Sequence, residues 1–443
     1  RYIAGYFISL GYKVTYMTID DLRSQYFAAK NTKKTDIRQY NFTVNKSYGP
    51  KNILAIVGVH TPGKYLTAIP GTINKKKKIS ENIKLTGPAV YGTRLQGGMK
   101  SESTKGFEIL NFDLTYTEIA KYSLLGASIV KQIPDLRIIE IETGHGCNKG
   151  KCSFCLEPLK YDPEFRKKDD IIAEISVFYK LGCRYFRIGK QTDFYSYPDC
   201  INLLKTIREK FPEIKVLHID NVNPNSVVSD KKDEITKSVI KYCSPGNVAA
   251  FGIESFDPVV IKENCLNTIA ETAKKAIRII NNYGSCRADN GLPKYLPGIN
   301  LIFGLKNESK QTFEKNYQAL KEIYDEGLML RRINIRQVSV FSGTEMEKHG
   351  LRFIKKNKKY YWSARNRIRN GIDFPMLKRI FPVGTVLKDV YSEIHDGNNT
   401  FARQIGTYPI IVGIKKKLPL KKFYDVKVTG HMLRSITGTV IRP

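Results

Sequence analysis

The sequence has little cysteine, little tryptophan and few acidic residues. Its 443 residues include eight cysteines, one tryptophan and 42 acids, against 73 lysines and arginines. Eight thiols are too few for a disulfide framework in a chain of this length. There is no run of about 18 apolar residues and no signal peptide at the start, so neither a membrane span nor secretion is predicted. We therefore expect a cytoplasmic protein with no membrane partner.

The chain also lacks an initial methionine. It begins at Arg1, in a segment whose pattern predicts a helix from Tyr2 to Leu10 and a strand from Val14 to Ile19. A strand ahead of this helix would complete the pattern. We therefore expect the sequence to be a fragment that is truncated at its start.

The shortage of acids leaves a formal net charge of +31. Lysine runs at 75–78 and 415–417 concentrate part of this charge. A charge of this size exceeds what solubility requires and predicts attraction to a polyanion. RNA is the leading candidate partner. The alternative is a lysine-rich proteome in which such runs are solvated faces.

Residues 1–134 have the mixed pattern of an α/β domain. The stretch "ILAIVGVHTPGKYL" predicts a buried strand that turns at Thr61 to Gly63 into a helix, and "IKLTGPAVYG" predicts another strand. The basic stretch "INKKKKISEN" lies between them as a predicted loop or exposed helix. Together these patterns predict a small Rossmann-like sheet.

Residues 135–350 alternate regularly between strand and helix patterns, which predicts parallel βα units. We expect strands at 136–143, 183–189, 216–220, 248–253, 298–305 and 332–341. Helices are expected at 169–181, 201–210, 233–242, 268–283 and 312–324. Six units are too few to close an eight-stranded barrel, so we predict a partial (β/α)6 barrel with its chemistry at the carboxyl ends of the strands.

Residues 351–380 form a predicted basic linker. Its stretch "KKNKKYYWSARNRIRN" has seven lysines or arginines and no acid, and it could follow a phosphate backbone and stack bases. The predicted RNA contacts are Lys355, Lys356, Lys358, Lys359, Tyr361, Trp362, Arg365, Arg367 and Arg369. The alternative is an amphipathic helix that docks its aromatic residues on the barrel.

Residues 381–443 change to short alternating strands with glycine turns, in "VGTVLKDVY", "TYPIIVGI", "YDVKVTGH" and "SITGTVIRP". This pattern predicts a small all-β module of the OB-like kind. OB-like modules are frequent nucleic-acid binders, so this prediction agrees with RNA as a partner.

Three of the cysteines, Cys147, Cys152 and Cys155, lie in "GHGCNKGKCSFC", the loop after the first predicted barrel strand. A structural zinc site needs a fourth thiolate or histidine at comparable spacing, and only His145 is near. Three thiolates without a fourth suit a [4Fe-4S] cluster that leaves one iron open. Structural zinc remains the alternative. The other five cysteines are scattered and are expected to be buried or free thiols.

A three-cysteine loop after the first strand of a partial barrel, with the aromatic Phe154 before the last cysteine, resembles the radical S-adenosylmethionine superfamily. The resemblance implies that Cys147, Cys152 and Cys155 bind a [4Fe-4S] cluster whose open iron chelates the methionine part of S-adenosylmethionine. Reductive cleavage then gives a 5′-deoxyadenosyl radical. The spacing x4 then x2 departs from the usual x3 then x2. Phe154 is expected near the adenine.

Later strand ends also resemble this superfamily, in particular its elongator-like and methylthiotransferase branch. The motifs are "FRIGKQTDF", "HIDNVNP", "FGIES", "GINLIFGLKNES" and "RQVSVFSGTEM", and Lys190, Asn300 and Lys306 depart from the branch's pattern. The resemblance implies that S-adenosylmethionine is contacted by Gln191, Asp220, Asn221, Glu254 and Ser255.

The order of the domains extends the resemblance. The module at 381–443 resembles, more weakly, the RNA-binding TRAM domain of methylthiotransferases, and residues 1–134 resemble either their N-terminal domain or a cobalamin-binding domain. The whole layout is similar to an uncharacterised archaeal radical enzyme family with a C-terminal helix-hairpin-helix, a motif that would lie beyond Pro443.

Several specific activities lose support from the sequence. No cysteine precedes Cys147, so the N-terminal domain offers no ligands for a second, sulfur-donating cluster. His60 lacks the Asp-x-His-x-x-Gly pattern of a cobalt ligand, so cobalamin is possible but has no ligand motif. Cys286 is an alternative catalytic thiol or hydrogen-atom donor.

The leading hypothesis is a radical enzyme that modifies a base in tRNA or rRNA, by methylation, by sulfur or methylthio insertion, or by rearrangement. In such enzymes the cofactor carries the radical and the protein supplies orientation. An electron donor such as ferredoxin or flavodoxin is the other expected partner. The alternatives are a radical enzyme that acts on a protein or small metabolite, and an RNA-binding protein with a structural cluster.

Overall fold

The structure, a computed structural model, describes residues 1–16, 53–56, 83–87, 90, 95–96, 99–100, 104–133, 135–148 and 150–442. The chain divides into two compact units, Arg1–Leu136 and Arg137–Pro443. The expected turn at Thr61 to Gly63, the stretch "INKKKKISEN" and His60 lie outside the described residues.

The first unit combines a helical pair with short strands. Helix α1 (Tyr2–Ser9) packs against α4 (Tyr116–Leu125) and the 3-10 helix η3 (Gly126–Gln132). Strands β1 (Ile53–Ile56), β2 (Ile83–Thr86) and β5 (Glu108–Ile109) form a parallel sheet, and β3 (Leu95–Gln96) pairs with β4 (Met99–Lys100). The helix at the start is confirmed. Residues 14–16, the described part of the strand expected at 14–19, are not in a strand.

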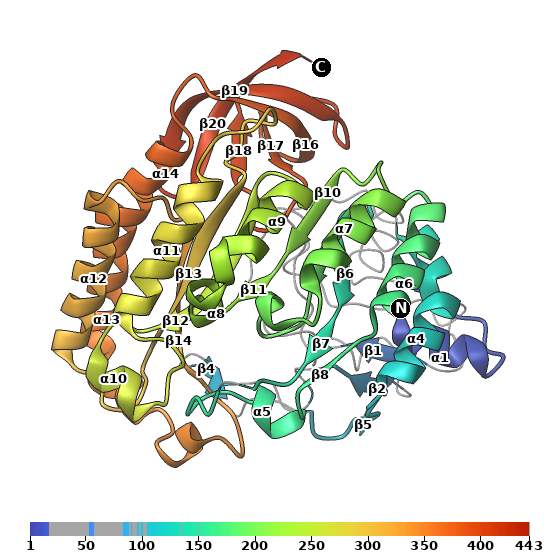
Figure 1. Ribbon diagram of the computed structural model, residues 1–443, viewed down its shortest axis with the longest axis horizontal. Coiled ribbons are helices and arrows are strands. Elements are labelled where there is room, and N and C mark those ends of the chain that lie inside the picture. The colour runs from blue at the N-terminus through green and yellow to red at the C-terminus, as the bar shows by residue number, and fades with distance from the viewer. Residues whose placement is uncertain are drawn as a thin grey trace. The chain divides into compact units, whose positions relative to one another are not determined.

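The second unit is built on six successive parallel strands (Figure 1). They are β6 (Ile139–Glu142), β9 (Tyr185–Gly189), β10 (Val216–Ile219) with its continuation β11 (Asn221–Val222), β12 (Asn247–Glu254), β13 (Tyr295–Phe303) and β14 (Arg332–Gln337). Each lies within a few residues of its predicted position. Strand β15 (Ser339–Val340) follows the last of them.

Helices line the outer side of these strands (Figure 1). They are α6 (Lys168–Lys180), α7 (Cys200–Lys210), α8 (Pro224–Ser229), α9 (Glu234–Tyr242), α10 (Pro258–Glu263), α11 (Ala270–Gly284) and α12 (Lys310–Asp325). Apolar residues at helical spacing explain the docking: Ala273, Ala276, Ile277 and Ile280 of α11 are all buried. Within the described ranges, no helix is long and apolar enough to cross a bilayer.

Strands β6 and β14 alternate between buried apolar and partly exposed polar residues, whereas β12 and β13 are buried along almost their whole length. In β6 the isoleucines Ile139 and Ile141 are buried and Glu140 is partly exposed. In β14, Ile333 is buried and Asn334 partly exposed. Since successive side chains of a strand point to opposite faces, one face of the sheet is apolar and the other is polar. The polar face is the inner wall of the partial barrel.

The chain then forms helices and a second, smaller barrel. The predicted linker at 351–380 is helical from residue 352 onward: it forms α13 (Arg352–Ile368), a π-helical turn (Arg369–Asp373) and α14 (Phe374–Ile380). Strands β16 (Val386–Asp396), β17 (Asn399–Gln404), β18 (Ile411–Ile414), β19 (Phe423–Met432) and β20 (Ser435–Arg442) close a barrel in the order β16-β17-β18-β20-β19. The sequence pattern did not predict β17.

The small barrel covers the amino ends of the six parallel strands (Figure 1). The buried backbone N–H of Thr407 donates to Nδ1 of His218 at 3.0 Å, and the Gln404 side chain donates to the Asn290 carbonyl at 2.8 Å. The carboxyl ends of the six strands lie at the opposite side of the second unit, where the cysteine loop begins.

Candidate functional site

The cysteine loop is framed by a short hairpin directly after β6. Strand β7 (Gly144–His145) pairs with β8 (Glu164–Phe165), so the loop leaves and returns at one place. Gly146 has φ +75°, and a Cβ there would lie 2.6 Å from the Asp162 backbone. Only glycine combines this backbone conformation with so close an approach. The turn therefore fixes where the loop starts.

The three cysteines are free, partly buried and close together. Burial, together with the neighbouring Cys155, Glu254 and Cys147, raises the pKa of Cys152 to about 12. Burial and the nearby acids also raise the pKa of Cys155. A thiolate here is therefore costly unless a cation binds it. The donor set fits an iron-sulfur cluster, whose irons would supply the compensating charge.

Backbone groups already face the sulfur atoms. The backbone of Asn267 lies close enough to Cys152 to lower the pKa of its thiol, and the backbone of Glu157 does the same for Cys155. A Cβ on Gly150 would lie 3.2 Å from the Cys147 sulfur, so the loop passes its own thiol closely. Within the described ranges, no three Cys, His, Asp or Glu side chains converge on one ion position. Each thiolate of a [4Fe-4S] cluster binds its own iron, so such convergence is not required.

Gln191 and Asn221, both predicted to contact S-adenosylmethionine, lie together beside the first strand. Gln191 is 1% exposed; its Oε1 accepts a hydrogen bond from Thr143 at 3.0 Å and its carbonyl accepts one from the Asn221 side chain at 3.1 Å. Its buried Nε2 has no hydrogen-bond partner among the described residues. A buried donor without a partner is suited to an acceptor atom of a ligand.

Glu254 lies where the resemblance placed it, next to the cysteines. It ends β12 in the left-handed region, at φ +64°, and its Oε2 is buried without a partner among the described residues. Burial raises the pKa of its carboxyl to about 8, although the nearby Arg336 lowers it. The carboxyl is therefore protonated at neutral pH and can donate a hydrogen bond.

Ser255 and Asp220 are placed differently from Glu254. The Ser255 hydroxyl bonds Asn316 of α12 at 3.4 Å and accepts from the Asp257 N–H at 3.1 Å, so it faces the helices. Its predicted contact with S-adenosylmethionine stays a prediction. Asp220 is buried on the polar inner wall, where the Tyr408 hydroxyl of the small barrel donates to it at 3.3 Å.

Phe154 packs into an apolar cluster that includes Leu305, Val338 and Met346. Its ring therefore helps to hold the cysteine loop against the ends of β13 and β15. Its predicted contact with adenine stays a prediction.

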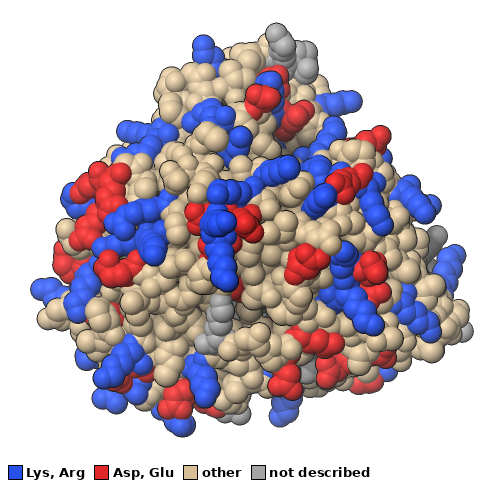
Figure 2. All heavy atoms as spheres, in the orientation of Figure 1, with Lys and Arg blue, Asp and Glu red and all other residues tan. Residues whose placement is uncertain are grey.

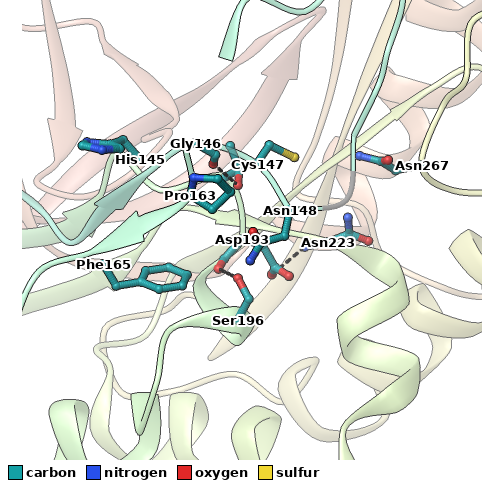
Figure 3. A pocket seen from close by; sticks show the side chains of 11 residues that line it. His145, Gly146, Cys147, Asn148, Pro163, Phe165, Asp193, Ser196, Asn223 and Asn267 are labelled. Atoms are coloured by element: carbon teal, nitrogen blue, oxygen red, sulfur yellow. Dashed lines mark hydrogen bonds between the residues drawn. The ribbon is translucent and has the colours of Figure 1, made fainter. Parts of the chain in front are cut away.

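A pocket of about 60 Å³ opens beside Cys147 (Figure 3). His145 to Asn148 line one side, and Thr192, Asp193, Asn223 and Asn267 are among the residues that line the rest. Asp193 is held by the Asn223 N–H at 3.0 Å and the Ser226 hydroxyl at 2.5 Å. The pocket is thus a polar recess at the carboxyl end of the barrel, directly against one predicted cluster ligand.

The polar inner wall contains residues that the sequence reasoning missed. Glu140 and Arg187 form an ion pair of 2.7 Å across β6 and β9, and the Asn334 and Asn300 side chains bond at 3.0 Å across β14 and β13. The alternating stretches "IEIE" and "RINIR" carry this information, because every second residue of such a strand is polar.

The predicted RNA contacts on α13 divide into two groups. Lys355, Lys356, Lys358 and Lys359 are exposed, and Trp362 is 55% exposed. Arg365 lies over the Trp362 ring, with its guanidinium carbon 5.4 Å from the ring centroid. This group can contact a partner.

The residues of the other group make contacts within the protein. Tyr361 is buried edge-on against Phe303, and Arg369 is buried in contact with Asp373 and donates to the Ile333 carbonyl. Arg367 pairs with Glu314. The prediction that Tyr361 and Arg369 contact RNA is therefore wrong, because they serve the docking of α13. Cys286, the alternative catalytic thiol, is exposed in a loop before β13, at the amino ends of the strands.

The comparisons agree with this site. The family model of the radical SAM superfamily matches residues 141–320, which run from β6 into α12. The chain belongs to the radical S-adenosylmethionine superfamily. An uncharacterized protein of Methanocaldococcus jannaschii is 40% identical over 498 positions that cover 100% of this chain and 89% of that protein. An uncharacterized protein of Archaeoglobus fulgidus is 38% identical, and the match covers 99% of this chain and 85% of that protein.

Two solved structures match part of the chain. The radical S-adenosylmethionine methyltransferase TsrM from Kitasatospora setae is 16% identical, with a TM-score of 0.37; the match covers 47% of this chain and 36% of that enzyme. Coproporphyrinogen III oxidase from Escherichia coli is 14% identical, with a TM-score of 0.36 and coverage of 66% and 71%.

As a member of this superfamily, the protein is an enzyme that uses a [4Fe-4S] cluster and S-adenosylmethionine. Bound together, the two groups supply a deoxyadenosyl radical by reductive cleavage. Cys147, Cys152 and Cys155 are the residues that would hold the cluster. Gln191 offers a free donor and Glu254 a protonated carboxyl beside them, and the surrounding helices keep these groups out of bulk water.

Proposed function

We propose that this enzyme modifies a nucleotide in tRNA or rRNA, by methylation or by sulfur or methylthio insertion, with a single-electron donor such as ferredoxin or flavodoxin. The observation that carries the proposal is the lysine face of α13, defined here as Lys355, Lys358, Lys359 and Trp362. These residues are spaced at i, i+3, i+4 and i+7, so they share one side of the helix. All four are exposed.

The charge on this face is uncompensated. No described carboxylate lies within ion-pair distance of the three lysines, whereas Arg367 on the same helix is paired with Glu314. Lysines supply phosphate contacts and an exposed indole supplies a surface on which a base can stack. Figure 2 shows that basic side chains are widespread on the visible face, with acidic ones interspersed.

The small barrel gives independent support. It has five strands, with β18 parallel to β20 and the other pairs antiparallel, and OB-type barrels of five strands bind oligonucleotides. Its loop between β18 and β19 exposes lysines at 415–417 and 421–422. A folded RNA that contacts these surfaces could present one unstacked base to the carboxyl end of the large barrel.

The binding part of the proposal is tested with bulk archaeal tRNA and the full chain at several salt concentrations. The variant K355Q/K358Q/K359Q should lower the salt slope of log Kd by about 2 to 3, since each phosphate contact contributes about 0.7 to 0.9. The matched control K180Q/K241Q/K275Q removes the same charge from three exposed positions elsewhere, one each on α6, α9 and α11. Equal slopes for the two variants, or binding that is insensitive to salt, would contradict the proposal.

The chemical part is tested by mass spectrometry of tRNA and rRNA nucleosides from a strain that lacks the gene. A modification that is missing there and restored by the wild-type chain would identify the target base and the group added. An unchanged nucleoside profile would instead favour a protein or small metabolite as substrate.

A further inference from the structure

Ser153, between two of the cluster cysteines, has every polar group bonded to another part of the fold. It is 5% exposed. Its N–H donates to the Asn264 carbonyl at 3.0 Å, its hydroxyl donates to Asn264 Oδ1 at 2.7 Å, and its carbonyl accepts from the Met346 N–H at 2.8 Å. The turn from Cys152 to Cys155 is therefore anchored at its centre.

Asn264, which supplies two of these bonds, is itself held on all sides. It follows α10 and is 0% exposed. Its Nδ2 donates to the Val260 carbonyl at 2.9 Å and the Lys306 carbonyl at 3.0 Å, and its Oδ1 accepts from the Lys306 N–H at 3.1 Å. Because the Lys306 carbonyl needs a donor and its N–H needs an acceptor, these two groups fix the orientation of the Asn264 side-chain amide. The amide oxygen is the atom that Ser153 reaches.

A second asparagine makes the same structural bonds without the cysteine loop. Asn281 of α11 donates to the Ile277 carbonyl at 3.0 Å and the Met329 carbonyl at 3.0 Å, and it accepts from the Met329 N–H at 2.8 Å. Both asparagines join a helix to the backbone of a later loop. They differ in that Asn264 bonds Ser153 as well.

We propose that Asn264 is a positioning residue for the iron-sulfur site, which holds the Cys152–Cys155 turn in its binding conformation before iron arrives. The bonds link three loops, those after β6, α10 and β13. They also hold the segment that begins at Asn264, in which the Asn267 backbone lies close enough to Cys152 to lower the pKa of its thiol. Hydrogen bonds to a ligand sulfur raise the reduction potential of a cluster, and groups behind the ligands set metal affinity.

The test compares N264A with the matched variant N281A, without RNA or S-adenosylmethionine, so its outcome is independent of the proposed substrate. Three quantities are measured after anaerobic reconstitution: the melting temperature of the apoprotein, the rate of iron loss to excess EDTA, and the midpoint potential of the cluster. Both variants should lower the melting temperature. Only N264A should speed iron loss, by about 10- to 100-fold, and shift the potential downward.

S153A keeps the proposal testable if N264A does not fold. It removes only the hydroxyl bond, so we expect faster iron loss than in the wild type but slower than in N264A, and S153A/N264A should lose iron no faster than N264A. The proposal is overturned if N264A and N281A lose iron at the same rate, if the potential of N264A equals that of the wild type, or if S153A releases iron as slowly as the wild type.

Discussion

The two ends of the large barrel are built differently. At the carboxyl ends of β9, β12 and β13, Lys190, Glu254 and Asn307 all have left-handed backbones, with φ between +62° and +73°. Buried polar atoms such as Gln191 Nε2 and Glu254 Oε2 have no described partner there. At the amino ends, the small barrel docks through hydrogen bonds to His218 and Asn290. The carboxyl ends, which carry the cysteine loop, therefore form the reactive end, and the amino ends, which the small barrel covers, form the supporting end.

Asn264 and Asn281 make the same kind of hydrogen bonds, each to a helix and to the backbone of a later loop. What distinguishes them is the loop that each one borders. At the reactive end, Asn264 therefore keeps the bonds that Asn281 also makes and adds one more, to Ser153 of the cysteine loop.

The largest effect is expected at the reactive end. Cys152→Ala should abolish iron-sulfur absorbance after reconstitution, because two thiolates would remain for a cluster that needs three protein ligands. Iron content per chain measures the loss. Cys286→Ala, an exposed thiol outside the cysteine loop, is the control and should retain the wild-type iron content. Equal iron in both variants would mean that the loop does not hold the cluster.

A smaller but substantial effect is expected where the two barrels meet. The Tyr408 ring lies under the Arg332 guanidinium at 4.0 Å, and its carbonyl accepts from Arg331 at 2.7 Å. Tyr408→Ala should cost about 3 kcal/mol of unfolding free energy, because it removes a partly buried aromatic ring. Tyr408→Phe should cost only about 1 kcal/mol, the hydroxyl bond to Asp220. Denaturant titration of both variants measures these values, and equal losses would show that the ring contributes nothing.

The docking of the small barrel should also depend on pH, through His218. Burial, with a contribution from Arg187, lowers the pKa of His218 to about 4 from an ordinary value of 6.5. His218 is therefore neutral in the folded protein, and its Nδ1 accepts from Thr407. As the pH falls below 6.5 the unfolded chain gains a proton that the folded chain does not, so up to about 3 kcal/mol of stability is lost by pH 4.

His218→Asn offers an acceptor that does not titrate. Its unfolding free energy should therefore fall less between pH 6.5 and pH 4 than that of the wild type. Thermal unfolding across this range makes the comparison. Identical pH profiles for the two proteins would show that His218 is not the group responsible.

Local patterns predicted the frame of the second unit well. Alternating apolar residues located the six strands, and the spacing of the cysteines located the site. The burial of Tyr361 could also have been predicted from helical spacing, because Tyr361 shares a side of α13 with the buried Ile354 and Ile368. The basic composition of that segment obscured this pattern, so Tyr361 was assigned to RNA.

Contacts between distant residues could not be predicted in the same way. Ser153 and Asn264 are 111 positions apart, and Thr407 and His218 are 189 apart. Nothing in the neighbourhood of either residue indicates its partner, because the pairing arises only when the strands assemble. The docking of the small barrel on the amino ends, and the role of Asn264, therefore required the structure.

The most direct test of the central claim is the cleavage of S-adenosylmethionine by the reduced, reconstituted protein. The wild type should form 5′-deoxyadenosine, and the variant C147A/C152A/C155A should form none above the background without protein. Absence of 5′-deoxyadenosine from the reconstituted wild type, or its continued formation by the triple variant, would contradict the assignment of the carboxyl end as the reactive end.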